Sequence, residues 1–221
     1  MTERSRNAVV SRWSHAGIAA VILASLVIQL VLIFAGGADA NSGDTGAAVG
    51  LGTRLYRLFS FFTIQSNLIV LAAAIGLVLR PLRDGAFWRV VRLDSLLGIV
   101  ITGLVFAIVL APQVHLTGWA LAATIGFHYV SPWTTLAAWL ALGPRPRLTW
   151  RAVVLAFVWP LAWLVYIFTQ GAFTHWYPYP FLDVTSLGLA TALRNAAFVL
   201  VLGLLLASGL KALDTKLPAR T

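Results

Sequence analysis

Six long apolar runs constrain this chain more than any other feature of its sequence. A helix needs about 20 mainly apolar residues to cross the ~30 Å hydrocarbon core of a bilayer. Segments rich in Gly and Pro separate the runs, and none shows the two-residue alternation of a membrane β-strand. The sequence therefore predicts an all-α polytopic membrane protein, a bundle of six transmembrane helices that forms one transmembrane domain. The expected spans cover residues about 13–35, 58–79, 93–111, 119–142, 152–170 and 185–210.

The composition excludes a soluble protein. Hydrophobic residues make up 60% of the chain and charged residues only 10%, whereas a soluble domain has roughly a quarter of its residues charged. The absence of cysteine from the sequence excludes disulfides, a thiolate nucleophile and Cys-ligated zinc. Because the net charge of +9 comes from basic residues in alternate loops, we expect no nucleic-acid partner.

Lysine and arginine are distributed asymmetrically between the two ends of the predicted bundle. Of the 16 in the chain, 13 lie on one side, and only Arg54 and Arg57 lie in a loop on the other. The positive-inside rule then places both termini in the cytoplasm, which fits a multi-pass protein of the bacterial inner (plasma) membrane. The 13 residues are Arg4, Arg6, Arg12, Arg80, Arg83, Arg89, Arg92, Arg145, Arg147, Arg151, Lys211, Lys216 and Arg220.

The first apolar run raises the question of a signal peptide. Ala38-Asp39-Ala40 follows the run and has the small residues of a cleavage site. The apolar core is longer than the ~7–15 residues of a signal-peptide h-region. We therefore expect the first helix to be retained, and cleavage after Ala40 is the alternative.

Several polar residues are predicted to lie at one depth inside the bundle. Counted from the outer ends of their spans at 1.5 Å per residue, Asn67, His128 and Arg194 all lie ~14 Å deep, with Thr63 about one turn above them. Thr63, Ser66 and Asn67 follow i, i+3, i+4 spacing and share a helix face. Ionisable groups in a span usually face the bundle interior, so we expect one shared pocket beneath the outer leaflet.

A structural explanation of the same residues is also open. Ser, Thr, Asn and His often form interhelical hydrogen bonds that contribute about 0.6 kcal/mol each. Pro132 deprives the His128 carbonyl of its helical partner and predicts a bend there, although proline is common in membrane helices. Asp94 is expected to pair with Arg92 or Arg89.

The last outer loop alternates aromatic residues with prolines and contains no Lys or Arg. It is expected to form an aromatic belt at the membrane interface or a lid over the outer mouth of the bundle. Neither HxxxH nor HExxH spacing occurs, and nucleotide fingerprints are absent. We therefore predict no metal and no cofactor. Because the chain is predicted to lie in a membrane, we expect membrane lipids as its partners. The candidate lid residues are Trp176, Tyr177, Tyr179 and Asp183.

Three parts of the sequence resemble a known family. Phe61-Phe62-Thr63-Ile64-Gln65-Ser66-Asn67-Leu68, then His128, then Trp176-Tyr177-Pro178-Tyr179-Pro180-Phe181-Leu182-Asp183-Val184 resemble the Pr6Pr family of six-helix membrane proteins, found mainly in actinobacteria. The chain is also distantly similar to the androgen-induced family of intramembrane hydrolases, which cleave fatty acid esters of hydroxy fatty acids. That similarity implies that Thr63 is a nucleophile and His128 its partner.

The chemistry of this pair is consistent with ester hydrolysis. A Thr hydroxyl becomes a useful nucleophile when a base within hydrogen-bond reach removes its proton, and a histidine such as His128 is suited to that role. Asn67, Arg194 or Ser66 would bind the substrate or a developing oxyanion.

Three function classes remain open: a lipid-ester hydrolase, a non-enzymatic protein that binds or transports a lipid or small acid, and a structural membrane subunit. In the second class, Arg194 and His128 would hold an anionic lipid or acid. The hydrolase requires Thr63 and His128 to lie within about 4 Å of each other, and a gap beyond about 8 Å would argue against it.

Overall fold

The computed structural model describes residues 3–44, 49–81, 83–145 and 147–219, and these residues form helices without a β-strand. The predicted all-α class is therefore confirmed. Arg220, one of the basic residues counted above, lies outside the described residues. The α-helices are α1 (Glu3–Phe34), α2 (Leu51–Ser60), α3 (Phe62–Leu79), α4 (Ala86–Val105), α5 (Gly118–Ile125), α6 (Ser131–Leu142), α7 (Trp150–Ala156), α8 (Val158–Thr174), α9 (Val184–Leu187) and α10 (Leu189–Lys216). Two π-helical turns, η1 (Phe106–Leu110) and η3 (Gly126–Val130), and two 3₁₀ turns, η2 (Ala111–Gln113) and η4 (Pro180–Leu182), complete them.

Five helical segments of the described chain are long and apolar enough to cross a membrane, and they correspond to the first, second, third, fifth and sixth predicted spans. The fourth predicted span is also continuous helix, from Gly118 through η3 to Leu142. It is less apolar because it contains His128, Pro132 and three tryptophans. The five segments are Arg6–Phe34, Phe62–Leu79, Ala86–Gln113, Trp150–Thr174 and Leu189–Lys216.

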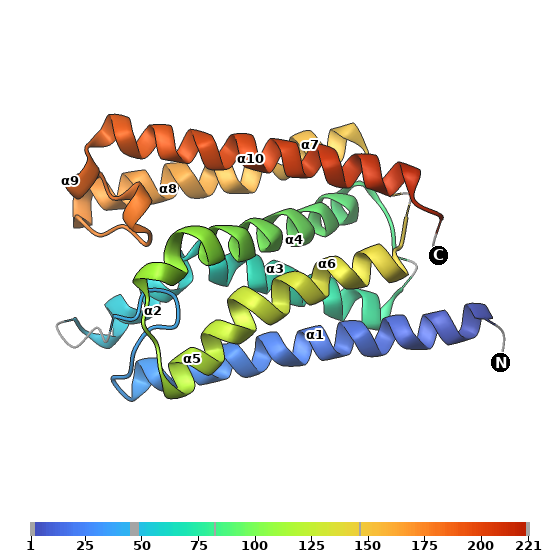
Figure 1. Ribbon diagram of the computed structural model, residues 1–221, viewed down its shortest axis with the longest axis horizontal. Helices are drawn as coiled ribbons and strands as arrows, with labels where there is room; N and C mark the ends of the chain where they lie inside the picture. Colours follow the sequence, from blue (N-terminus) through green and yellow to red (C-terminus); the bar gives the residue numbers. More distant parts are fainter. Residues whose placement is uncertain (1–2, 45–48, 82, 146, 220–221) are drawn as a thin grey trace.

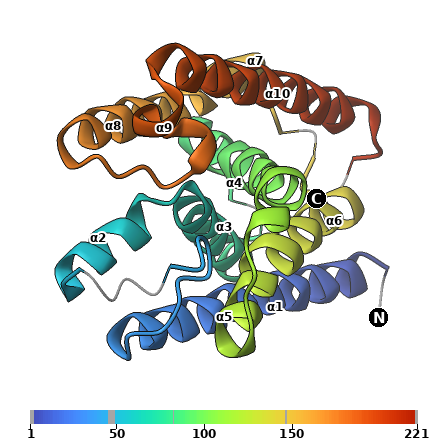
Figure 2. The same cartoon turned by 60° about the vertical axis from the view of Figure 1, so that its left-hand side comes forward.

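The long helices lie side by side along the longest axis, and both ends of the chain lie at the same end of the bundle (Figure 1). In Figure 2, α7, α8 and α10 form one layer, α1, α5 and α6 form the opposite one, and α4 lies between them. The α4 helix is the central element, because 67% of its most apolar stretch is buried, against 22% for α10.

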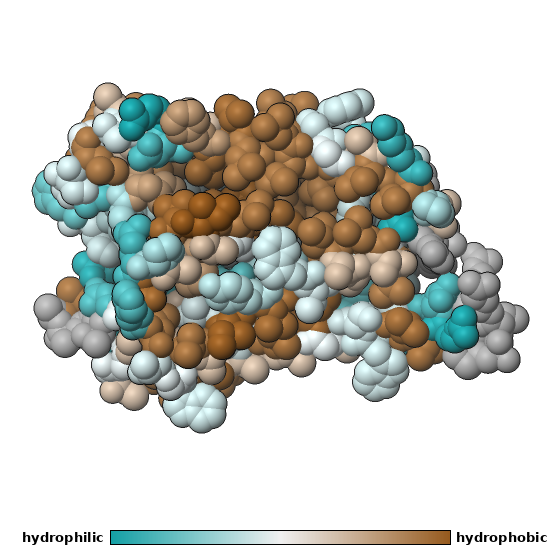
Figure 3. Space-filling view, in the orientation of Figure 1, coloured by the Kyte–Doolittle hydropathy of each residue, from teal (hydrophilic) through white to brown (hydrophobic). Residues whose placement is uncertain are grey.

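The surface has the distribution expected of a protein that spans a bilayer. Apolar residues cover much of the middle of the face in Figure 3, whereas hydrophilic residues gather at the two ends. Large apolar side chains such as Val165 of α8 and Leu205 of α10 are more than two-thirds exposed. Exposed apolar surface on this scale requires an apolar environment around the molecule.

The second predicted span consists of two helices. It was expected to begin near Leu58, but the backbone at Phe61 is extended (ψ 129°) and separates α2 from α3. The indole Nε1 of Trp163 donates to the Ser60 carbonyl at 2.9 Å, which holds this break in place. Thr63 consequently lies in the first turn of α3.

The sixth predicted span also begins later than expected. Thr185 belongs to the short helix α9, and Gly188 (φ +75°) ends it, so that the long helix begins at Leu189. A positive φ favours glycine, which has no Cβ. Arg194 therefore lies about 8 Å from the start of its helix at 1.5 Å per residue, not ~14 Å.

Asp94 does not form its predicted ion pair. Arg89 instead binds both carboxylate oxygens of Asp84, each at 2.8 Å. Arg92 and Asp94 are both buried, but residues two apart on a helix point about 200° away from each other. Neither makes an ion pair with a residue that the structure describes.

Candidate active site

Thr63 lies at the N-terminal end of α3, where backbone N–H groups have no partner inside the helix. Its N–H donates to the hydroxyl of Tyr179 at 3.1 Å. The Thr63 side chain is buried, with 3% of the residue exposed. The break at Phe61 thus leaves one amide and one hydroxyl of the same residue free to contact groups outside α3.

His128 lies in the π-helical turn η3 and contacts Thr63. Its Nδ1 is 3.2 Å from the Thr124 carbonyl oxygen. Because a carbonyl only accepts, Nδ1 carries the hydrogen and Nε2 is an acceptor. Thr63 Oγ1 lies 3.3 Å from Nε2, so the Thr63 hydroxyl donates to His128. The predicted approach of these two side chains is therefore present in the structure.

The ring of His128 is held in a fixed orientation. Phe106, in the π-helical turn η1, stacks on it with ring centroids 3.7 Å apart. The predicted irregularity near Pro132 is present, since η3 directly precedes this proline in α6. Gly103 of α4 lies so close that an added Cβ would be 2.9 Å from Pro132 Cβ and 3.4 Å from the His128 carbonyl oxygen. The close contact of α4 with α6 therefore depends on a glycine.

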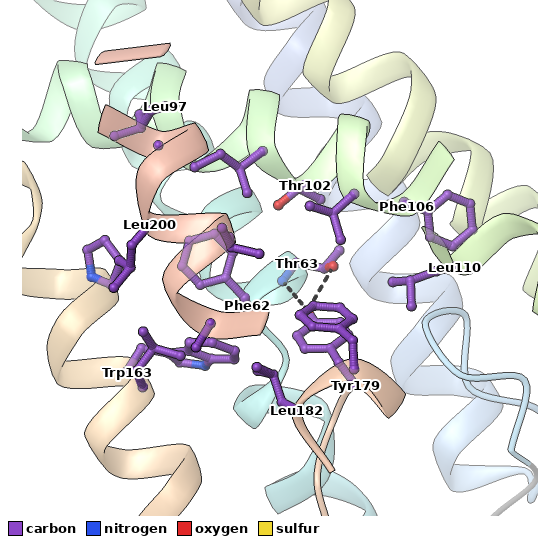
Figure 4. A pocket seen from close by; sticks show the side chains of 18 of the residues that line it. Phe62, Thr63, Leu97, Thr102, Phe106, Leu110, Trp163, Tyr179, Leu182 and Leu200 are labelled. Atoms are coloured by element: carbon purple, nitrogen blue, oxygen red, sulfur yellow. Dashed lines mark hydrogen bonds between the residues drawn. The ribbon is translucent and has the colours of Figure 1, made fainter. Parts of the chain in front are cut away.

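Tyr179 completes the site, although the sequence suggested only a lid role for it. It lies in the loop that follows α8, between Pro178 and Pro180, and is buried. Its hydroxyl is 3.3 Å from Thr63 Oγ1. Since the Thr63 hydroxyl proton points to His128, the Tyr179 hydroxyl donates to Thr63 Oγ1. Figure 4 shows both contacts of Tyr179 with Thr63 as dashed lines.

Ser66 and Asn67 support Thr63 from below and do not face a substrate. Ser66 Oγ donates to the Thr63 carbonyl at 3.0 Å and lies 2.8 Å from Thr102 Oγ1. Asn67 Nδ2 donates to the carbonyls of Thr63 and Phe127, at 2.8 and 3.3 Å. With its donors engaged, Asn67 fixes α3 against η3 and is not an oxyanion donor in this structure.

Arg194 does not join the cluster. It is exposed on α10 and forms no hydrogen bond or ion pair with the part of the chain that the structure describes. The buried α10 residues nearest to it in the sequence are Ala192 and Ala196, on the other side of the helix. The predicted depth match was wrong because the span was assumed to begin at Thr185, above the break at Gly188.

The other three candidate lid residues pack against or cap neighbouring segments. Trp176 packs edge-on against Phe61 and lies under the guanidinium of Arg57, 5.1 Å from Cζ. Tyr177 packs so closely on Gly171 that a side chain there would overlap its ring. Asp183 accepts from the Thr185 N–H at 2.8 Å and caps α9. The loop therefore covers the site at the N-terminal end of α3, and Tyr179 alone of the four contacts Thr63.

A cavity of about 70 Å³ adjoins Thr63. Its wall is almost entirely apolar and comes from α3, α4, η1, α8, η4 and α10, as Figure 4 shows for part of the lining. The polar lining groups are Thr63, Thr102 and Tyr179, with the indole of Trp163. A site with one reactive hydroxyl and apolar walls suits a ligand that has an apolar chain and few polar atoms.

The described residues contain no group of three or more His, Asp or Glu side chains placed to hold a metal ion. His128 is oriented by a backbone carbonyl, and no carboxylate contacts it among the residues described. The chemistry that this arrangement supports is therefore transfer of a proton from a hydroxyl to an imidazole.

Comparisons of the chain with models of protein families, with curated proteins and with solved structures found no match.

Proposed function

We propose that the chain spans a bacterial plasma membrane six times, with both termini in the cytoplasm. Five apolar helices are long enough to cross a bilayer, and the helix Gly118–Leu142 runs alongside them. An even number of spans agrees with the two termini lying at one end of the bundle (Figure 1). The basic loops lie at that same end, which is the cytoplasmic one by the positive-inside rule.

We further propose that the protein hydrolyses lipid esters within the membrane, with Thr63 as nucleophile and His128 as general base. The 3.3 Å contact between Thr63 Oγ1 and the acceptor nitrogen of His128 carries this proposal. A nucleophile and its base must meet within hydrogen-bond reach. The proposed roles of Thr63 and His128 agree with the chemistry of the hydrolase family that the sequence resembles.

In the first step, the Thr63 hydroxyl proton moves to Nε2 of His128 while Oγ1 bonds to the ester carbonyl carbon. The same proton then passes from His128 to the departing alkoxide oxygen, leaving an acyl-threonine. Water, deprotonated by His128, attacks this second ester, and release of the acid restores Thr63. Each proton taken by the imidazole is thus returned within its own half-reaction.

The oxyanion of the tetrahedral intermediate needs donors close to Thr63 Oγ1. The Thr63 N–H and the Tyr179 hydroxyl are the two donors beside that atom, and they contact each other at 3.1 Å. An arriving oxyanion would take the Thr63 N–H from the Tyr179 oxygen and the Tyr179 hydroxyl proton from Thr63 Oγ1. Asn67 would instead have to give up the two backbone carbonyls that it joins, and Arg194 is exposed on α10. One such donor contributes about 3–4 kcal/mol to transition-state stabilisation in known hydrolases.

The apolar cavity favours an ester with a hydrocarbon chain. Its volume of about 70 Å³ is below the ~150 Å³ that holds benzene in an engineered protein cavity. Only the part of the chain next to the ester fits the structure as it stands, so the cavity must widen for a whole lipid to enter.

The test is ester hydrolysis by the purified protein in detergent, using fatty acid esters of increasing chain length. Thr63→Ala and His128→Gln should each lose activity by a factor of at least about 10³, and Thr63→Ser should retain part of it. Thr135→Ala is the matched control, because Thr135 is another buried threonine whose hydroxyl has no hydrogen-bond partner among the described residues. Equal activity in Thr63→Ala and Thr135→Ala would overturn the assignment.

A further inference from the structure

A second cluster of functional groups lies at the opposite end of the bundle, about the start of α4. The loops around Asp84 and Arg147 meet there and enclose a small cavity of about 10 Å³. The arginines that line it are Arg83, Arg89, Arg92 and Arg147. None of these side chains takes part in the proposed hydrolysis.

Arg92 is the feature that needs an explanation. It is 7% exposed, and its Nη2 is buried without a hydrogen-bond partner. A guanidinium stays protonated in proteins, and a buried charge is normally paired. Arg92 forms no ion pair with any residue in the described ranges, and the nearby Asp94 projects from another side of α4. The protein alone therefore leaves a buried cation uncompensated.

The one carboxylate that lines this cavity is already in use. Asp84 accepts two hydrogen bonds from Arg89 at 2.8 Å and lies 3.2 Å from Nη1 of Arg147. The lining side chains, four arginines and one aspartate, carry a net charge of +3. Asp214 accepts from the backbone N–H groups of Arg147 and Leu148 just behind the lining and reduces the net charge of the cluster to +2. Asp84 fixes two of the arginines in place but cannot neutralise Arg92 and Arg83 as well.

The remaining unmatched group at the cavity is also a donor. The indole Nε1 of Trp88 is buried without a partner, and an indole N–H only donates. Arg83 covers the same indole, with its Cζ 4.5 Å from the ring centroid. The cavity thus presents unused donors from Arg92 and Trp88. At about 10 Å³ it has room for one oxygen-sized group, so an anion would place one acceptor oxygen inside and its other oxygens outside, beside the exposed Arg83.

We propose that this cluster is a binding site for a phosphate group, supplied by the headgroup of an anionic phospholipid. Phosphate oxygens accept several charge-assisted hydrogen bonds from guanidinium groups. Basic pockets among membrane helices on the cytoplasmic side are known sites for anionic headgroups. That the phosphate belongs to a lipid rests on the proposed topology, which puts this end of the bundle at the cytoplasmic leaflet. That the site binds a phosphate group does not depend on the topology.

The experiment measures thermal unfolding of the full-length protein in a neutral detergent. Phosphatidylglycerol should raise the unfolding temperature of the wild type, and phosphatidylcholine at the same concentration should not, since binding to the folded state alone stabilises it. The same measurement with glycerol 3-phosphate tests a water-soluble phosphate compound in place of the lipid. If it stabilises as well as phosphatidylglycerol, the site takes free phosphate compounds; stabilisation by the lipid alone identifies the headgroup.

Two variants test the site itself. Arg92→Met should unfold at the same or a higher temperature than the wild type without lipid, because a buried unpaired charge is removed, and should no longer respond to phosphatidylglycerol. Arg83→Gln leaves the buried core unchanged. It should raise the phosphatidylglycerol concentration needed for the same stabilisation about tenfold, as expected for the loss of one charge-assisted hydrogen bond.

Arg80→Gln is the matched control, an exposed arginine at the same end that does not line the cavity. Its lipid response should equal that of the wild type. The proposal is overturned if phosphatidylglycerol fails to stabilise the wild type, or if Arg83→Gln and Arg80→Gln respond equally. Since none of these residues lies near Thr63, loss of the lipid response would leave ester hydrolysis intact.

Discussion

The Tyr179 hydroxyl links the loop after α8 to Thr63 and offers the sharpest test at the scale of single residues. Tyr179→Phe keeps the ring and its packing against Phe61 and Phe181 but removes the hydroxyl. We expect kcat for ester hydrolysis to fall about 10²–10³-fold, the usual cost of losing one oxyanion donor. The free energy of unfolding should fall by about 1–3 kcal/mol, because the buried Thr63 N–H loses its acceptor. A variant with full activity would show that the Thr63 N–H alone binds the oxyanion.

Asp84 gives a pH dependence whose sign follows from its partners. The hydrogen bonds from Arg89 hold the pKa of the Asp84 carboxyl well below its usual value. A pKa that is lower in the folded state stabilises the protein at pH values above the usual one, near 4, and this contribution is lost as the pH falls.

The unfolding temperature of the wild type should therefore fall more steeply than that of Asp84→Asn between about pH 5 and pH 2. Because both side chains of the ion pair are about one-third exposed, about 1 M salt should reduce the difference. Parallel pH profiles of the two proteins at low salt would contradict this assignment.

At the scale of helices, the contact of α4 with α6 depends on Gly103. A Cβ there would lie 2.9 Å from Pro132 Cβ, so Gly103→Ala must push the two helices apart and disturb the stack of Phe106 on His128. We expect a loss of about 1–3 kcal/mol in the free energy of unfolding, together with reduced activity.

The control for that substitution is Gly209→Ala, on α10. A Cβ added there meets no atom within 4 Å, so the higher helix propensity of alanine should stabilise the protein by up to about 1 kcal/mol. Chemical denaturation in detergent measures both variants. If Gly103→Ala is as stable as Gly209→Ala, the helices are not as close as the structure places them.

The sequence predicted the helical elements better than it predicted their ends. Apolar runs identify helices because a helix that crosses a bilayer needs apolar side chains. A helix continues beyond the run wherever its backbone hydrogen bonds can form, as α1 does at its start, Glu3. The breaks at Phe61 and Gly188 are set by tertiary contacts and by one backbone angle. No pattern in the apolar runs reveals either break, and the break at Gly188 accounts for the wrongly predicted depth of Arg194.

The candidate site was predictable in part for the same reason. Thr63 and His128 were identified because polar residues inside apolar spans are few, and the structure places them in contact. Tyr179 was assigned to a lid because a loop residue carries no periodicity that shows which way it points. A tyrosine between two prolines, in a loop without Lys or Arg, was the available signal.

At the scale of the whole molecule, the proposed topology can be tested with cysteines, because the chain contains none. Ser186→Cys lies at the end with α9, and Thr215→Cys lies near the C-terminus; both positions are exposed. A membrane-impermeant maleimide should label Ser186→Cys in intact cells and Thr215→Cys only after the membrane is permeabilised. The reverse pattern would invert the topology, and labelling of both in intact cells would exclude it.

Covalent labelling is the strongest test of Thr63 as a nucleophile that His128 activates. The purified protein is treated with a fluorophosphonate probe, and the modified peptide is identified by mass spectrometry. We expect labelling at Thr63 in the wild type and in Thr135→Ala, and its loss in His128→Gln. Equal labelling of wild type and Thr63→Ala, or modification of a different residue, would contradict it.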